Sequence, residues 1–85
     1  MSITLAEGVS VAETDSGAVL LDERSGRYWQ LNAAGARVLN RLLSGDTPAR
    51  AGIVAANGAS VPAERTEADA HALLEKLRQA GLVRR

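Results

Sequence analysis

The side chains that could carry catalysis are few in this chain of 85 residues. Asp22 and Glu23 are adjacent carboxylates, and Glu64, Glu67 and Asp69 form a second acidic group. Carboxylates at such positions can act as general acids or bases. The first pair, however, lies in an expected hairpin loop, and the second group lies at an expected helix start, where the helix dipole favours acids. We therefore interpret both groups as structural.

The chain has one histidine, His71, and no cysteine. Without cysteine there is no disulfide, no thiolate zinc site and no cysteine nucleophile. His71 lies about 100° from Ala70 around an expected helix, beside its apolar stripe, so we interpret it as a surface residue. The sequence also contains no serine elbow and no glycine-rich loop with the spacing of a phosphate cradle. These observations predict a protein that is not an enzyme and that holds no cofactor and no metal.

Charge argues against nucleic acid as a partner. Ten Lys and Arg residues balance ten Asp and Glu residues, whereas a duplex-binding protein usually carries a basic excess. The expected elements also fit a winged helix, which reads DNA with a helix rich in Arg, Lys, Asn or Gln. Arg50 is the only Arg or Lys residue of the expected second helix. DNA binding is therefore the weaker alternative, and we predict no nucleic-acid partner.

Length and hydropathy limit the architecture and the location of the protein. A chain of this size predicts one domain, residues 1–85. No apolar run approaches about 18 residues, and the first residues lack the pattern of a signal peptide. We therefore expect a cytoplasmic protein with no membrane partner.

The two aromatic residues of the chain are neighbours, Tyr28 and Trp29. They lie in a run, 27–31, whose alternation predicts a strand with Trp29 and Leu31 on one face and Tyr28 and Gln30 on the other. An edge strand without proline can accept an extended peptide as an added strand. We favour Trp29 as a core residue, with a contact role as the alternative. For Tyr28 a contact role and an ordinary half-exposed position both stay open.

The elements that would position these residues follow from the hydrophobic periodicity of the sequence. This periodicity changes at residue 32 from that of strands to that of helices. Runs within 9–32 predict three antiparallel strands, separated by loops at 15–17 and 22–26 that each end in glycine. Asn32 is an expected N-cap of a first helix that ends at Gly45, and Thr47 caps a second helix that ends at Asn57 and Gly58. A loop over 58–65 and a third helix from an N-cap at Thr66 to a Schellman end at Gly81 complete the chain. The predicted fold is α+β, a three-stranded antiparallel N-terminal sheet followed by three helices.

The third helix carries a wide apolar stripe. Its members are Ala70, Leu73, Leu74, Leu77 and Ala80. The ordinary role of such a stripe is to fill the core. A small domain needs only part of it, so the remainder can line a groove, and which edge of the stripe would do so stays open.

Residues 20–32 resemble a motif of PqqD-like proteins. The sequence Leu-Leu-Asp-Glu-Arg-Ser-Gly-Arg-Tyr-Trp-Gln-Leu-Asn is similar to the signature LLD-x-x-(S/T)-G-x-Y-x-x-LN of that family. Apolar and glycine positions of the later helices also match, so that the resemblance covers about residues 9–83. It implies a RiPP recognition element, a winged-helix-like β3α3 domain that binds the leader segment of a ribosomally made precursor peptide.

The resemblance also implies a site and a set of partners. The leader would add as a strand along the third strand, in a cleft against the third helix. The implied contact residues are Arg27, Tyr28, Trp29, Gln30 and Leu31 of the strand and Asp69, Ala70, Leu73, Leu74, Leu77 and Arg78 of the helix.

We favour a free-standing member of lasso-peptide biosynthesis. Its implied partners are a transglutaminase-like leader peptidase and an asparagine-synthetase-like, macrolactam-forming cyclase. The alternative within the family is a peptide chaperone for a radical-SAM enzyme, as in pyrroloquinoline quinone biosynthesis.

Overall fold

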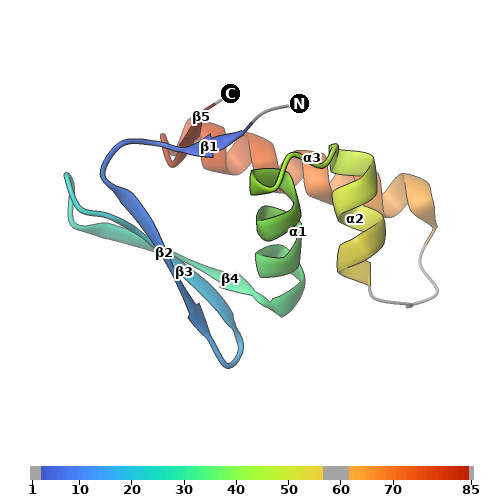
Figure 1. Cartoon of the computed structure of the whole chain (residues 1–85), viewed down its shortest axis with the longest axis horizontal. Helices are drawn as coiled ribbons and strands as arrows, with labels where there is room; N and C mark the ends of the chain where they lie inside the picture. Colours follow the sequence, from blue (N-terminus) through green and yellow to red (C-terminus); the bar gives the residue numbers. More distant parts are fainter. Residues whose placement is uncertain (1–2, 57–61, 85) are drawn as a thin grey trace.

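Three antiparallel strands precede three helices, as the sequence predicts, and two very short strands join the ends of the chain (Figure 1). The computed structural model describes residues 3–56 and 62–84. The elements are β1 (Thr4–Leu5), β2 (Val9–Thr14), β3 (Gly17–Asp22), β4 (Arg27–Asn32), α1 (Ala33–Leu43), α2 (Pro48–Ala56), α3 (Ala63–Gln79) and β5 (Val83–Arg84).

The main sheet is an antiparallel meander in the order β2-β3-β4. A two-residue turn joins β2 to β3, and Gly17 follows it with φ near 153°. A Cβ at residue 17 would overlap the carbonyl oxygen of Leu31 on β4. Glycine is therefore required there because two backbones come into close approach.

The loop between β3 and β4 is held by Asp22. Its carboxylate accepts the backbone N–H of Arg24 at 3.1 Å, and its carbonyl accepts the N–H of Gly26 at 2.8 Å. Gly26 has φ 73°, which glycine adopts at no steric cost. These bonds fix the register in which Asp22 pairs with Arg27 and Leu20 pairs with Trp29.

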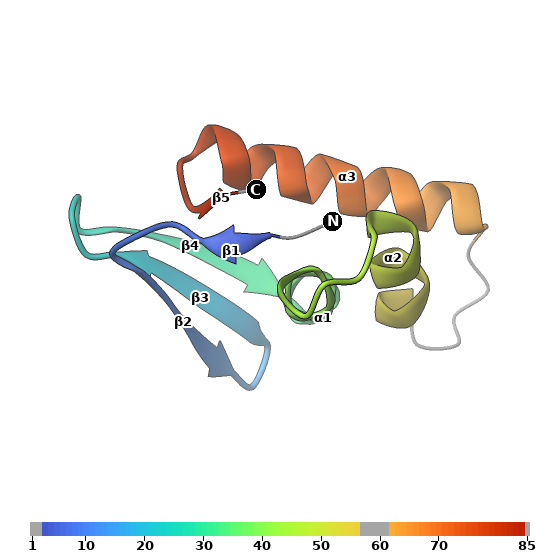
Figure 2. The same cartoon turned by 45° about the horizontal axis from the view of Figure 1, so that its top comes forward.

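The helices cover one face of the meander (Figure 2). Leu20 of β3, Leu39 and Leu42 of α1 and Leu82 after α3 are the largest fully buried side chains. Asn32 caps α1 as predicted, since its side-chain oxygen accepts the N–H of Gly35 at 2.8 Å. The predicted Thr47 cap is also present, because its hydroxyl accepts the N–H of Arg50 at 3.3 Å.

The third helix begins earlier than predicted. α3 starts at Ala63, with Pro62 at the N-cap, and Thr66 is a buried residue inside its first turns. The predictions of a Thr66 N-cap and of a loop through residue 65 are therefore wrong, because the helix begins directly after Pro62, with Glu64 in the first turn, where the helix dipole favours an acid. The rest of the expected loop, and the expected end of the second helix at Asn57 and Gly58, lie largely outside the described residues.

The end of α3 is the predicted Schellman motif. The N–H of Leu82 donates to the carbonyl of Leu77 at 2.9 Å, and the N–H of Gly81 donates to that of Arg78 at 3.0 Å. The chain then enters β5, which pairs antiparallel with β1. This two-stranded sheet was not predicted, since strands of two residues are too short to show a period.

Candidate functional site

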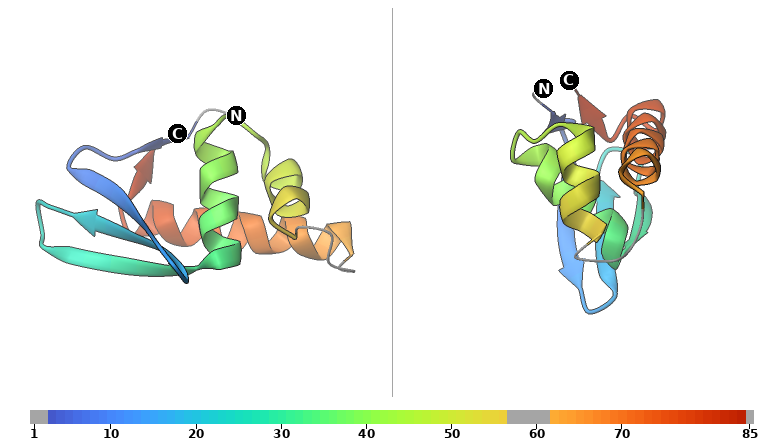
Figure 3. Two further views of the ribbon diagram at one scale, coloured as in Figure 1. Left: turned by 60° about the horizontal axis from the view of Figure 1, so that its bottom comes forward. Right: turned by 90° about the vertical axis from the view of Figure 1, so that its right-hand side faces the viewer.

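The free edge of β4 is the first component of the candidate site. β4 lies at one end of the strand order, so alternate backbone groups of Arg27–Asn32 have no partner among the strands of residues 3–56 and 62–84. β4 is also the meander strand on the α3 side of the molecule (Figure 2, Figure 3). It packs on β3 and α1 but makes few if any contacts with α3. The edge is therefore open along its length.

The side chains of β4 alternate between the two faces of the sheet. Tyr28 is 65% exposed and lies opposite Leu21 on the outer face, which none of the described helices covers. Gln30 follows it on the same face. Leu31 lies on the core-facing side, opposite the buried Ala18, and packs on the core.

Trp29 does not fill the core. It lies on the core-facing side, opposite the fully buried Leu20, yet it remains 37% exposed and stands outside the buried cluster. The preferred prediction was wrong because β4 is an edge strand, so no neighbouring strand covers the outer side of the ring. The guanidinium carbon of Arg27 lies 5.8 Å from the ring centroid, within the range of a cation–π contact.

The predicted residues of α3 divide between the core and the surface. Ala70, Leu74 and Leu77 are buried in the main hydrophobic cluster. Leu73 is partly buried, and Asp69 and Arg78 are exposed. The core members can therefore support a wall of the site, and only the flanks of the stripe are accessible in the free chain.

The two flanks of the α3 stripe differ. Asp69, Leu73, Lys76 and Ala80 follow one another at intervals of four, three and four residues, which places them on one flank of the helix. We call these four residues the α3 flank. Arg78 lies on the opposite flank, where its guanidinium contacts the Glu75 carboxylate at 3.0 Å. The spacing in the sequence could have identified Lys76 and Ala80 as companions of Asp69 and Leu73.

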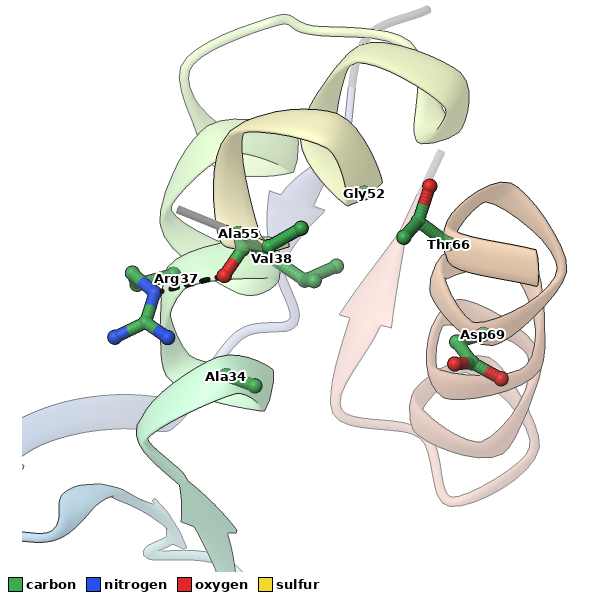
Figure 4. A pocket seen from close by; sticks show the side chains of 8 residues that line it. Ala34, Arg37, Val38, Gly52, Ala55, Thr66 and Asp69 are labelled. Atoms are coloured by element: carbon green, nitrogen blue, oxygen red, sulfur yellow. Dashed lines mark hydrogen bonds between the residues drawn. The ribbon is translucent and has the colours of Figure 1, made fainter. Parts of the chain in front are cut away.

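A pocket shows which flank faces β4 (Figure 4). It has a volume of about 330 Å³ and lies between the start of α1, the end of α2 and the first turns of α3. Its lining residues are Ala34, Arg37, Val38, Gly52, Ala55, Ala56, Thr66 and Asp69. Because α1 begins directly after β4, the α3 flank that contains Asp69 is the one on the β4 side. The sequence did not predict this pocket, since small residues of three separate helices form it.

Polar groups at the pocket are few. Arg37 donates from Nε to the carbonyl oxygen of Ala55 at 3.0 Å, and it lies across the pocket from Asp69 (Figure 4). Within residues 3–56 and 62–84, neither Asp69 nor Lys76 has an ion-pair partner.

Other titratable groups of the described chain do not form a reactive centre. The pKa of Asp22 is lowered: desolvation acts to raise it, but the hydrogen bonds from Arg24 and Ser25 outweigh that effect. This carboxyl holds the β3–β4 loop.

Among the described residues, no three His, Asp or Glu side chains gather in a way that could hold a metal ion. None of the described helices has the length and apolar character needed to cross a membrane.

Comparison with known proteins identifies the family. The model of the family described as coenzyme PQQ synthesis protein D (PqqD) matches residues 17–83. This chain belongs to the PqqD family. The match covers the β3–β4 loop, β4, all three helices and the start of β5. Both components of the candidate site, β4 and the α3 flank, therefore fall inside the PqqD region.

Two solved structures resemble this PqqD-family chain over nearly all of its length. One is a lasso peptide synthetase B1 complexed with its leader peptide, with 39% identity, full coverage of both chains and a TM-score of 0.89. The other is TbiB1 in complex with the TbiA(beta) leader peptide, with 29% identity and a TM-score of 0.80, and it covers 98% of this chain and 94% of that one. No protein with a curated description matches the sequence.

Proposed function

We propose that this PqqD-family protein recognises the leader segment of a lasso-peptide precursor. The observation that carries the proposal is the free β4 edge beside the α3 flank, in a fold shared at 39% identity with a synthetase B1 that is complexed with a leader peptide. An extended peptide is the ligand that an unpaired strand edge binds best, because its backbone completes the ladder.

The leader adds to β4 as an antiparallel strand. Each new backbone hydrogen bond contributes about 0.5–1.5 kcal/mol net. Alternate leader side chains then point into the groove between β4 and α3, where Trp29, Leu31 and Leu73 offer partly exposed apolar surface. Ala70, Leu74 and Leu77 support this surface from the core, and Arg78 stays on the far flank. The pocket beside Ala34 can receive one further apolar leader side chain where β4 ends.

The protein acts without catalysing a reaction itself. This proposal is supported by the structural roles of the carboxylates: Asp22 holds the β3–β4 loop, Glu64 lies in the first turn of α3, and Glu67 pairs with His71. Its partners are the precursor, a transglutaminase-like leader peptidase and an asparagine-synthetase-like cyclase, to which it presents the bound leader. A second candidate within the family, a chaperone for a radical-SAM enzyme of quinone biosynthesis, is favoured by the name of the matching family model. The match to the lasso peptide synthetase B1 favours the lasso pathway.

A binding titration tests the proposal. The leader of the precursor encoded with this chain, labelled with a fluorophore, should bind with a Kd below roughly 10 μM, a range that corresponds to about −7 kcal/mol. Leu73→Glu should weaken binding at least about tenfold, because it places an unpaired charge against apolar leader side chains.

The matched control is Ala72→Glu, which introduces the same charge one position away, at an exposed site off the α3 flank. This control should bind like the wild-type protein. Equal loss in both variants, or no binding by the wild-type protein, would count against the proposed groove. Thermal unfolding of each variant separates lost affinity from lost structure.

A further inference from the structure

Two charges of opposite sign stand on the α3 flank. Asp69 and Lys76 are both exposed, and neither has an ion-pair partner in the described part of the chain. They are seven residues apart, so they differ by only about 20° around the helix and by about 10 Å along it. One wall of the groove is thus anionic at one point and cationic at another.

The direction of α3 relative to β4 orders these two charges along the strand. β4 runs toward the start of α1, whereas α3 starts on the far side of α2 and runs back in the opposite direction (Figure 1, Figure 2). Asp69 lines the pocket together with Ala34 in the first turn of α1, which directly follows Asn32, so Asp69 lies on the Asn32 side of β4. Lys76 follows about 10 Å further along α3, in the direction that leads back toward the Arg27 end of β4. The nearby Arg37 already donates to the carbonyl oxygen of Ala55.

We propose that the groove selects leader peptides by charge polarity. This inference rests on the proposed antiparallel addition of the leader to β4. An antiparallel strand begins at the Asn32 end and finishes at the Arg27 end. The bound segment therefore carries a basic residue that faces Asp69 and, further toward its C-terminus, an acidic residue that faces Lys76.

The spacing of these two leader residues follows from the geometry of a strand. Only alternate side chains of the leader face α3, so the basic and acidic residues are separated by an even number of positions. A separation of about 10 Å at about 3.4 Å per residue gives two or four positions. These local charges on the α3 flank set the preference between peptides of opposite polarity.

A charge swap within the groove tests the inference. Asp69→Lys combined with Lys76→Asp reverses the polarity of the flank and leaves the net charge unchanged. Two synthetic versions of the leader serve as probes, one with Lys at the N-terminal and Glu at the C-terminal groove-facing position, and one with these residues exchanged. The wild-type protein should prefer the first peptide roughly 5- to 20-fold at low salt, and the swapped protein should prefer the second.

The control swap is Glu67→Lys combined with Arg84→Glu. Both residues are exposed and lie outside the α3 flank, and the net charge is again unchanged. This variant should keep the wild-type preference. Both peptides could bind the wild-type protein while the groove swap leaves the ratio of their two Kd values unchanged. That result would refute selection by charge polarity and would leave the proposal of leader binding intact. If neither peptide binds the wild-type protein, leader recognition itself fails.

Discussion

Trp29 shows at the scale of one residue how the site is made. Alternation in the sequence correctly places it on the core-facing side of β4, opposite Leu20. Its burial could not be predicted from alternation, because burial depends on whether another strand or helix covers the edge. The ring is left 37% exposed, with Arg27 stacked over it. A large side chain that faces inward without being covered is available to a ligand.

Replacing this ring should affect binding more than folding. Trp29→Ala should weaken leader binding about tenfold or more, since partly exposed tryptophans at peptide sites contribute strongly to affinity. Leu21→Ala, which truncates an exposed residue of the outer sheet face, should leave affinity within about twofold. Fluorescence anisotropy of labelled leader gives both values. Equal affinity of the Trp29→Ala and wild-type proteins would remove Trp29 from the site.

At the scale of elements, periodicity predicted the three meander strands and the three helices. The register followed from two turns whose glycines and Asp22 could be recognised in the sequence. The start of α3 and the β1–β5 pair could not be found in this way. A proline N-cap has no side-chain signal of its own, and two-residue strands form only because the ends of the chain meet. The pocket escaped prediction because it depends on the packing of three helices.

The contact between α2 and α3 depends on Gly52. A Cβ at this position would overlap the carbonyl oxygen of Thr66 and approach its Cβ to 3.1 Å. Alanine normally stabilises a helix by up to about 1 kcal/mol relative to glycine. Here Gly52→Ala should instead lower the free energy of unfolding by about 1–3 kcal/mol, because α2 must move away from α3.

Gly35→Ala in α1 is the matched comparison. There a Cβ would meet only side-chain atoms, at 3.3 Å or more. Its effect should stay within about 1 kcal/mol of zero. Urea unfolding of the two variants measures the difference. An equally stable Gly52→Ala protein would show that the close packing of α2 on α3 is not required.

At the scale of the whole molecule, the fold holds β4 and α3, the two walls of the proposed site, apart. α1 joins the end of β4 to the helical layer, and the β1–β5 pair ties the start of the chain to the end of α3. The backbone N–H of Ala6 also donates to the carbonyl of Leu82 at 2.9 Å, which further connects the segment after β1 to the segment after α3. Because β4 and α3 are connected through these elements and scarcely through each other, an open edge remains between them. The zero net charge and the sparse basic residues of α2 fit a peptide ligand better than a nucleic acid.

Amide hydrogen exchange of the full chain, with and without its leader peptide, tests the central claim most directly. Strand addition at β4 predicts that alternate backbone amides within Arg27–Asn32 exchange more slowly when leader is bound, because they then donate to the leader strand. The amides of β2, the other edge of the same sheet, should be unchanged and serve as the internal control. Slower exchange at β2 instead, or unchanged exchange at β4 with saturating leader, would contradict the account.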